Sequence, residues 1–128
     1  MFQGTMTKIA DAAQATKHLL VKFGSAATHI VVNGVATAPI GTCPDTPALG
    51  DSAAVLLLGS ASESITMVAS EAITVGSRVF AAADGEISDL PAGAGTYFCV
   101  GVALEAAAAD QDEIQVDPCI PFSVVVSG

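Results

Sequence analysis

Short apolar runs broken by turn-forming residues dominate the chain from about residue 18 onward. Gly, Pro, Asn-Gly or Asp-Gly interrupts these runs roughly every eight to twelve residues. Such spacing is typical of an all-β sandwich or barrel. The pattern therefore predicts an all-β fold, a small antiparallel β-sandwich or barrel. The expected strands cover residues 18–23, 29–32, 35–40, 53–58, 64–69, 77–82, 86–88, 97–104, 113–117 and 122–126.

Two dipeptides predict tight turns between neighbouring strands. Asn33-Gly34 lies between the second and third expected strands, and Asp84-Gly85 lies between the sixth and seventh. These residue types tolerate the positive φ angles that a type I′ turn requires at both central positions. Each dipeptide therefore predicts an antiparallel hairpin.

Three segments are less regular. Apolar residues between Ile9 and Phe23 fall at helical spacing, but we favour an extended arm that feeds a strand at Leu19 over a helix. The alanines at 106–109 have high helix propensity. Because expected strands flank them closely, they predict a single helical turn or a turn within a hairpin. Residues 41–50 contain two prolines and two glycines, which indicates a surface loop.

The length accommodates an N-terminal arm over residues 1–17 and a single β domain over residues 18–128. A chain of 128 residues can bury one core but is too short for two ordinary domains with a linker. Hydrophobic residues make up 52% of the chain although its net charge is -9, which excludes a disordered acidic tail. Six aromatic residues make a thin core. We therefore expect further apolar surface to be buried against other chains.

Charge is distributed unevenly along the chain. Residues 1–40 carry three lysines against one aspartate, whereas residues 41–128 carry one arginine against twelve acids. The acidic body would repel a phosphate backbone, so no nucleic-acid partner is expected. The longest uncharged window, residues 24–44, contains a histidine, an asparagine, two prolines and three glycines. That composition argues against a transmembrane helix, and no membrane partner is expected.

Candidate chemistry is sparse. Cys43, Cys99 and Cys119 are odd in number and far apart, which makes a disulfide framework improbable and favours residence in a reducing cytosol. Neither these cysteines with the two histidines, nor the acids at 110–117, match a metal-binding pattern. The acids are expected to be solvated turn residues. The sequence contains no nucleophile elbow, phosphate-binding loop or His-Glu-x-x-His motif, so we predict neither an enzyme nor a cofactor.

Four runs in the second half of the chain resemble, in order and spacing, the capsid cement or head decoration proteins of tailed bacteriophages. They are ASEAITVGSRVF at 69–80, ADGEI at 83–87, GVALEAAAA at 101–109 and EIQV at 113–116. Upstream runs at 18–23, 40–42 and 49–55 fit the same order, so the resemblance covers nearly the whole chain after about residue 18. Gly76-Ser77 and Gln111-Asp112 depart from Gly-Asp pairs that are common in the family, and both are expected to lie in turns.

This resemblance implies a structural virion protein without catalytic activity. Such a protein binds the outer surface of the expanded capsid and clamps neighbouring major capsid proteins against internal DNA pressure. The resemblance also implies a homo-oligomer, with a trimer favoured over a dimer, on a virion assembled in the host cytoplasm. Linked copies would amplify a modest affinity at each site.

The arm over residues 1–17 is the predicted contact region. We expect Phe2, Met6 and Ile9 to be apolar anchors, and Lys8 and Lys17 to meet acidic groups of the capsid or of a neighbouring subunit. An arm folded onto its own domain is the alternative. One rival function is a carbohydrate-binding or adhesive β-domain on the virion, which would need exposed aromatic side chains to stack on sugars. The other is a small enzyme with an unrecognised site.

Overall fold

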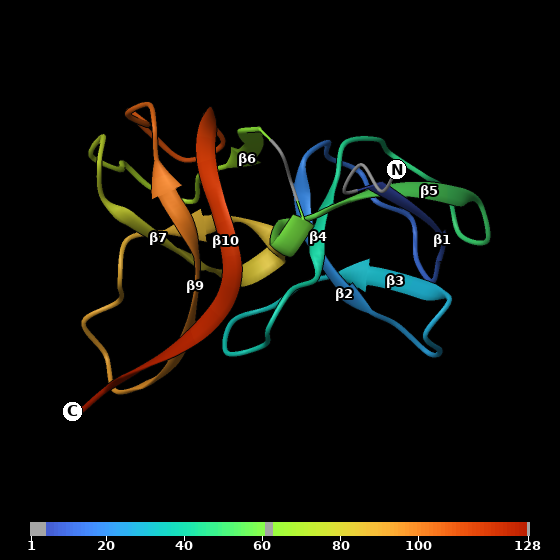
Figure 1. Ribbon diagram of the computed structural model, residues 1–128, viewed down its shortest axis with the longest axis horizontal. Helices are drawn as coiled ribbons and strands as arrows, with labels where there is room; N and C mark the ends of the chain where they lie inside the picture. Colours follow the sequence, from blue (N-terminus) through green and yellow to red (C-terminus); the bar gives the residue numbers. More distant parts are fainter. Residues whose placement is uncertain (1–4, 61–62, 128) are drawn as a thin grey trace.

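The computed structural model describes residues 5–60 and 63–127, which form two β-sheets lying side by side (Figure 1). One sheet is closed into a five-stranded barrel, and the other is an open five-stranded sheet. The barrel contains β1 (Thr5–Ala10), β2 (Leu19–Phe23), β3 (His29–Val32), β4 (Gly41–Cys43) and β5 (Ser52–Leu57). The open sheet contains β6 (Ile65–Val68), β7 (Arg78–Ala81), β8 (Ile87–Ser88), β9 (Gly95–Ala103) and β10 (Glu113–Val126). Two short 3₁₀ turns are η1 (Leu58–Ser60) and η2 (Ala83–Gly85).

The barrel has the strand order β1-β3-β2-β4-β5, and the antiparallel pairing of β1 with β5 closes it. β1 runs parallel to β3, while the other neighbouring strands of the barrel are antiparallel. Gly41 allows β4 to approach β5 closely, because a Cβ at this position would overlap the carbonyl oxygen of Leu56. Five buried residues fill the interior: Val21, Ile30, Cys43, Ala53 and Val55.

The open sheet has the order β6-β10-β9-β7-β8 and carries the larger hydrophobic core. Leu20 of β2 and Leu58 of η1 belong to the same core, so the barrel and the sheet share buried surface. Full burial of one large aliphatic side chain contributes about 1.5–3 kcal/mol. The other buried members are Ile65, Met67, Ala69, Ile73, Val79, Ala81, Ile87, Val100, Ala103, Ala107, Ile114 and Val116.

The all-β prediction is confirmed. The Asp84-Gly85 hairpin is also confirmed, since Phe80 of β7 pairs with Ser88 of β8 and both turn residues have positive φ, 60° and 75°. The alanines at 106–109 lie in the turn between β9 and β10 and form no helix. The two expected C-terminal strands are joined into the single long strand β10, whose register shifts between Pro118 and Phe122.

The predicted hairpin at Asn33-Gly34 is wrong. Residues 35–40 form no strand, and β3 instead pairs with β2 and β1. The cause is the set of hydrogen bonds that Asn33 forms. Its buried side chain donates hydrogen bonds from Nδ2 to the carbonyl oxygens of Gly34 (2.9 Å) and Thr37 (3.0 Å), and its backbone N–H donates to Leu20. These bonds hold an open loop rather than a two-residue turn.

The extended N-terminal arm is not confirmed. Within the described residues, positions 5–10 form β1 of the barrel, and no helix forms between Ile9 and Phe23. The following connection is also held to the barrel, because Gln14 is buried and its Nε2 donates to the carbonyl oxygens of Thr16 (2.8 Å), Cys43 (3.1 Å) and Asp45 (3.0 Å). Residues 5–17 therefore follow the alternative of a segment folded onto its own domain.

Candidate functional site

The described contact candidates of β1 lie on both of its faces. Met6 and Lys8 leave one face of the strand, and Ile9 leaves the other, because side chains alternate along a β-strand. Met6 and Ile9 are both exposed. Lys17 lies in the exposed connection between β1 and β2, and Phe2 lies outside the described residues. The structure therefore brings Met6 and Lys8 to one face of β1 but does not gather the five predicted residues into one site.

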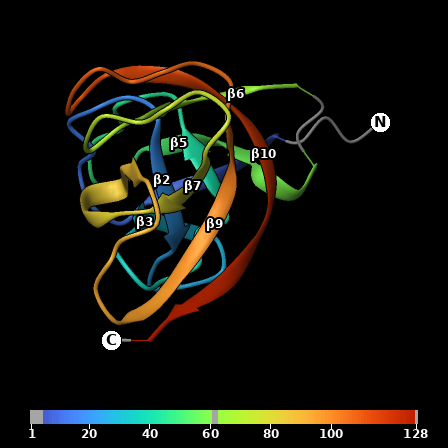
Figure 2. The ribbon, with the colours of Figure 1, turned by 90° about the vertical axis from the view of Figure 1, so that its left-hand side faces the viewer.

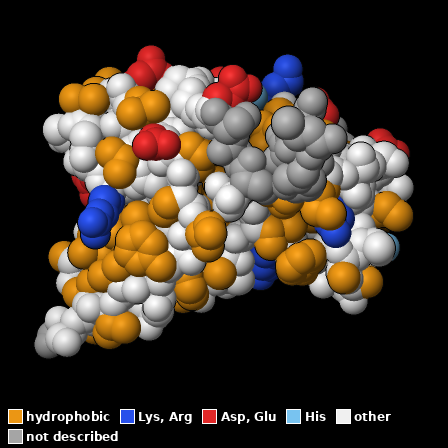
Figure 3. Space-filling view, viewed as in Figure 1, with side chains coloured by type: hydrophobic (Ala, Val, Ile, Leu, Met, Phe, Trp, Pro, Cys, Tyr) orange, Lys and Arg blue, Asp and Glu red, His pale blue; other side chains and the backbone are white. Residues whose placement is uncertain are grey.

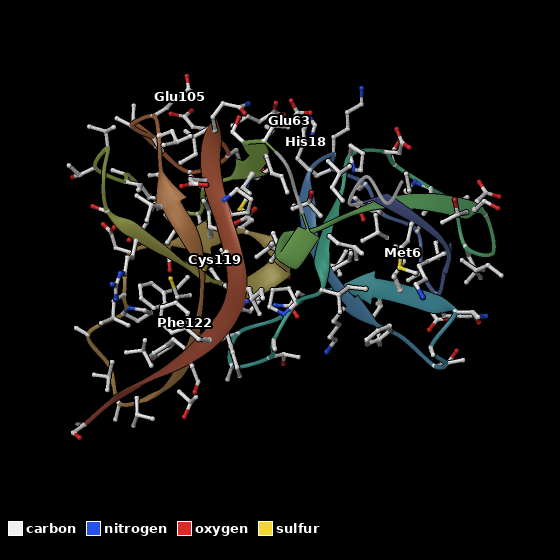
Figure 4. The ribbon with its side chains drawn as sticks, in the orientation of Figure 1. Met6, His18, Glu63, Glu105, Cys119 and Phe122 are labelled. Carbon is white, nitrogen blue, oxygen red and sulfur yellow. The ribbon has the colours of Figure 1, made fainter. Side chains whose placement is uncertain are left out.

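Lys8 forms a small amphipathic site with Phe23 on the barrel, and it lies two positions along β1 from Met6, which Figure 4 labels. Its Nζ donates a hydrogen bond to the carbonyl oxygen of Ala27 (2.7 Å) and lies 5.5 Å from the centre of the half-exposed Phe23 ring. That arrangement is a cation–π contact. The sequence prediction missed Phe23 here, since the residue sits at the end of an expected strand and is indistinguishable there from a core residue.

A second group of exposed apolar side chains lies on the C-terminal half of β10, toward the opposite end of the molecule from Met6 (Figure 4), and its members Phe122 and Val125 leave opposite faces of the strand. We define the β9–β10 ribbon as residues 95–103 together with residues 118–126, which run side by side to the C-terminal end (Figure 2). Ile120 is 71% exposed and Val125 is 72% exposed, and the Phe122 ring is exposed beside Arg78, whose guanidinium carbon lies 5.9 Å from the ring centre.

The ribbon is supported from one side and open along one edge. Phe80, Tyr97 and Cys99 form a buried cluster on which Cys119, Val124 and Val126 pack. The hydroxyl of Tyr97 donates a hydrogen bond to the carbonyl oxygen of Gly93 (2.9 Å). β6 pairs only with residues 113–116 of β10, so within the described chain the outer edge of residues 118–126 faces no strand. Such an edge can accept another strand, except where prolines remove the donor.

The two sheets differ in charge. The barrel region, residues 5–57, carries three lysines and three aspartates, whereas residues 58–128 carry one arginine and ten acids. The ribbon itself lacks charged side chains, since none occurs at 90–104 or 118–128. Acidic side chains gather instead along the upper edge in Figure 3, opposite the apolar surface around Phe122. A signal for this surface exists in the sequence: an uncharged apolar stretch after Asp117 in a chain of net charge -9.

Among the acids at 110–117, Asp112 stabilises the turn before β10, while Glu113 and Asp117 lie in β10 itself. The Oδ2 atom of Asp112 accepts hydrogen bonds from the backbone N–H groups of Ala108 (2.7 Å) and Ala109 (3.2 Å). In the described part of the chain, no group of three or more metal-ligating side chains converges. The same residues include no helix that is long and apolar enough to cross a membrane.

Asp11, Ser25 and His29 form the clearest polar cluster. The Nδ1 atom of His29 lies 2.6 Å from Oδ1 of Asp11 and 3.3 Å from Oγ of Ser25, whose backbone N–H also donates to Asp11. The hydrogen bond from His29, followed by that from the Ser25 backbone, lowers the pKa of Asp11. Both partners meet the same imidazole nitrogen, whereas a catalytic triad places acid and hydroxyl on opposite nitrogens. The cluster thus fastens the loop before β3 to the end of β1.

Comparisons with known proteins place the chain among phage head proteins. The sequence profile of a family described as phage cement protein matches residues 2–118. No curated protein matches the sequence. Among solved structures, the N base of the head fiber protein gp8.5 of bacteriophage phi29 is similar, with a TM-score of 0.67 and 18% identity, over 96% of this chain and 92% of that chain. Ile120, Phe122 and Val125 lie beyond the matched family segment.

Proposed function

The chain belongs to the phage cement protein family, and from that premise we propose that it binds the outer capsid surface and stabilises contacts between major capsid proteins. Membership makes it a structural protein of the phage virion. The observation that carries the finer proposal is the separation of surfaces. The ribbon is apolar and uncharged and the barrel, which bears Lys8 and Lys17, has no net charge, whereas the whole net charge of -9 belongs to the rest of residues 58–128, which would face solvent.

We assign the β9–β10 ribbon to contacts between copies of the chain. Copies with a net charge of -9 repel one another wherever their acids meet, so a contact between them is favoured on a surface without acids. The ribbon is such a surface, and its open edge at 118–126 can pair or pack with a neighbour. A trimer is favoured over a dimer on the family resemblance. Assembly would also multiply the capsid-binding sites of each particle.

The outside of the barrel around β1 is assigned to the capsid. Met6 supplies exposed apolar surface on the same face of β1 as Lys8, Ile9 supplies it on the other face, and Lys17 adds positive charge from the connection between β1 and β2. Phe2 precedes the same strand and is proposed to extend this contact. Lys17 is the cleanest probe of the five, because it is exposed in a connection between strands and its replacement does not disturb strand pairing.

The capsid proposal is tested by cosedimentation of the purified protein with mature capsids that lack it. Wild-type protein is expected to sediment with them and to raise their resistance to heat or chelation. Lys17→Glu is expected to weaken sedimentation, whereas Lys22→Glu, the same charge change on β2, serves as the matched control. Failure of the wild-type protein to bind such capsids would refute the proposed function.

The self-association proposal is tested with one introduced charge. Ile120 and Leu49 have the same exposed fraction, 71%, but only Ile120 lies on the ribbon. Burial of most of the Ile120 side chain would contribute about 1–2 kcal/mol, and each 1.4 kcal/mol is about tenfold in affinity. Ile120→Asp is therefore expected to weaken self-association at least about tenfold in sedimentation equilibrium, and Leu49→Asp is expected to leave it unchanged. If the two substitutions changed self-association equally, the ribbon would not be the interface between copies.

The carbohydrate-binding alternative receives no support from the exposed aromatic side chains. Phe23 and Phe122 are the exposed large aromatics of the described residues, and each ring already faces a cation, Lys8 or Arg78. Sugar binding would require these ring faces to be free for stacking. A glycan array with the isolated protein checks this: specific glycan binding together with absence of capsid binding would favour the alternative.

A further inference from the structure

Two of the three cysteines, separated by twenty positions in sequence, meet across the β9–β10 ribbon. Cys99 is buried on β9, and Cys119 lies on β10 within the stretch where the strand register shifts. Sγ of Cys119, which Figure 4 labels, lies 3.9 Å from the carbonyl oxygen of Cys99, and both side chains belong to the cluster that includes Phe80 and Tyr97. The two thiols therefore lie in one cluster, on neighbouring strands.

The third cysteine is placed quite differently. Cys43 is buried inside the barrel among Val21, Ile30, Ala53 and Val55. Its Sγ contacts the carbonyl oxygen of Asp45 at 3.8 Å. Cys43 therefore provides an internal reference for a thiol that has the same chemistry but lies in a separate core cluster from the other two.

We propose that Cys99 and Cys119 are a redox-active thiol pair that a low-molecular-weight disulfide such as oxidised glutathione converts into a cross-strand disulfide, while Cys43 stays a thiol. Cys119 reacts first because it is partly exposed and Cys99 is buried. Its thiolate attacks one sulfur of the oxidant, forming a mixed disulfide and releasing one glutathione thiolate. The Cys99 thiolate then attacks Sγ of Cys119 and releases the second. Two protein thiols are thereby oxidised to one disulfide, and one oxidised glutathione is reduced to two thiols, because each released glutathione thiolate takes up one of the two protons that Cys119 and Cys99 lose.

The environment makes the first step slow at neutral pH. Burial, together with the neighbouring Cys99 thiol, raises the pKa of Cys119 to about 11, although Arg78 acts in the opposite direction. The thiolate is the reactive form. The rate of the first step should therefore rise about tenfold for each pH unit between pH 7 and pH 9, because both values lie well below the pKa.

The bond would fasten the part of β10 that lies beyond the family match. A disulfide between residues 99 and 119 closes a loop across the turn at 104–112 and joins the two strands of the ribbon where the register shift interrupts their pairing. For a loop of this size, constraint of the unfolded chain would raise the thermal midpoint by about 10 °C. A reducing cytosol would keep the pair as thiols, and an oxidising exterior would close it.

The test exposes the full-length protein to a glutathione redox buffer at pH 7, 8 and 9, followed by acid quenching, alkylation and intact-mass and peptide mass spectrometry. Wild type is expected to lose two hydrogen atoms in mass, with the bond mapped to residues 99 and 119 and one alkylated cysteine, Cys43. Cys43→Ser should behave like wild type. Cys119→Ser, which replaces the partly exposed member, should form no intramolecular bond.

Several outcomes would overturn the inference. A glutathione adduct on Cys119 that never resolves, a disulfide involving Cys43, a bond between two chains, or three free thiols after prolonged exposure at pH 9 would each do so. An unchanged thermal midpoint after oxidation would refute the stabilising role of the bond. Because the test needs no capsid, its failure is distinguishable from failure of the proposed function.

Discussion

Substitution of Gly85 tests how the sheet is joined to the barrel. Gly85 lies at the tip of the β7–β8 hairpin with φ of +75°, and a Cβ there would lie 2.8 Å from Cγ1 of Val32 and 2.9 Å from Cβ of Leu19. Positive φ costs a residue with a side chain about 1–2 kcal/mol, offset by about 0.4–1 kcal/mol through the lower entropy of the unfolded chain. Overpacking adds about 1–3 kcal/mol. Gly85→Ala is therefore expected to lower the free energy of unfolding by about 2–4 kcal/mol.

Gly76→Ala separates the cost of the backbone conformation from the cost of overpacking. Gly76 has φ of +88°, but no atom lies within 4 Å of the position its Cβ would occupy. Its substitution should cost about 1 kcal/mol, the strain alone. Urea unfolding followed by circular dichroism measures both variants, and with a slope of about 2 kcal/mol per molar the midpoints should differ by about 1 M. Equal midpoints would refute the tight contact of the hairpin tip with β2.

Two further substitutions probe the polar groups of the barrel. Thr42→Val is expected to leave stability unchanged or to raise it by about 1 kcal/mol in urea unfolding, because the buried Oγ1 of Thr42 has no partner among the described residues; a loss above that size would show that the hydroxyl is bonded. Asp11→Asn should flatten the fall in thermal midpoint below about pH 4. The lowered pKa of Asp11 means that its ionised form stabilises the fold above its ordinary pKa and that this contribution is lost as the pH falls through the lowered value. An unchanged acid profile would contradict the contact with His29.

Local sequence pattern was sufficient where no side-chain hydrogen bond of a turn residue competes with the turn. Asp84-Gly85 and Asn33-Gly34 are equivalent signals for a type I′ turn, yet only the first forms one. At Asn33 the side chain is buried and bonds the following loop. The position of Asn33 depends on β2, because the carbonyl oxygen of Leu20 accepts a hydrogen bond from the Asn33 backbone N–H. Tertiary packing therefore decided between two identical local preferences.

β1 could not be predicted because its partners are distant in the sequence. Residues 5–10 mix Thr, Met, Lys, Ile and Ala without a marked apolar face. They become a strand by pairing with β3 about twenty residues away and with β5 more than forty residues away. The candidate contact surfaces also differ in how far the sequence indicates them. The contact roles of Met6 and Lys8 stay predictions from the sequence, whereas the exposure of the ribbon was not predicted, because its uncharged stretch after Asp117 was interpreted as an ordinary strand.

The unequal charges of the two sheets predict opposite responses of the two proposed contacts to salt. The ribbon has no charged side chain while the sheet that bears it holds the whole net charge of -9, so screening removes repulsion between copies without weakening the contact itself. The Debye length shortens from about 30 Å at 0.01 M to about 8 Å at 0.15 M salt. Self-association measured by sedimentation should therefore strengthen over this range. Capsid binding through Lys8 and Lys17 should weaken, because the same screening reduces their attraction to acidic groups. If both contacts weakened in parallel, the ribbon would not be the surface at which copies meet.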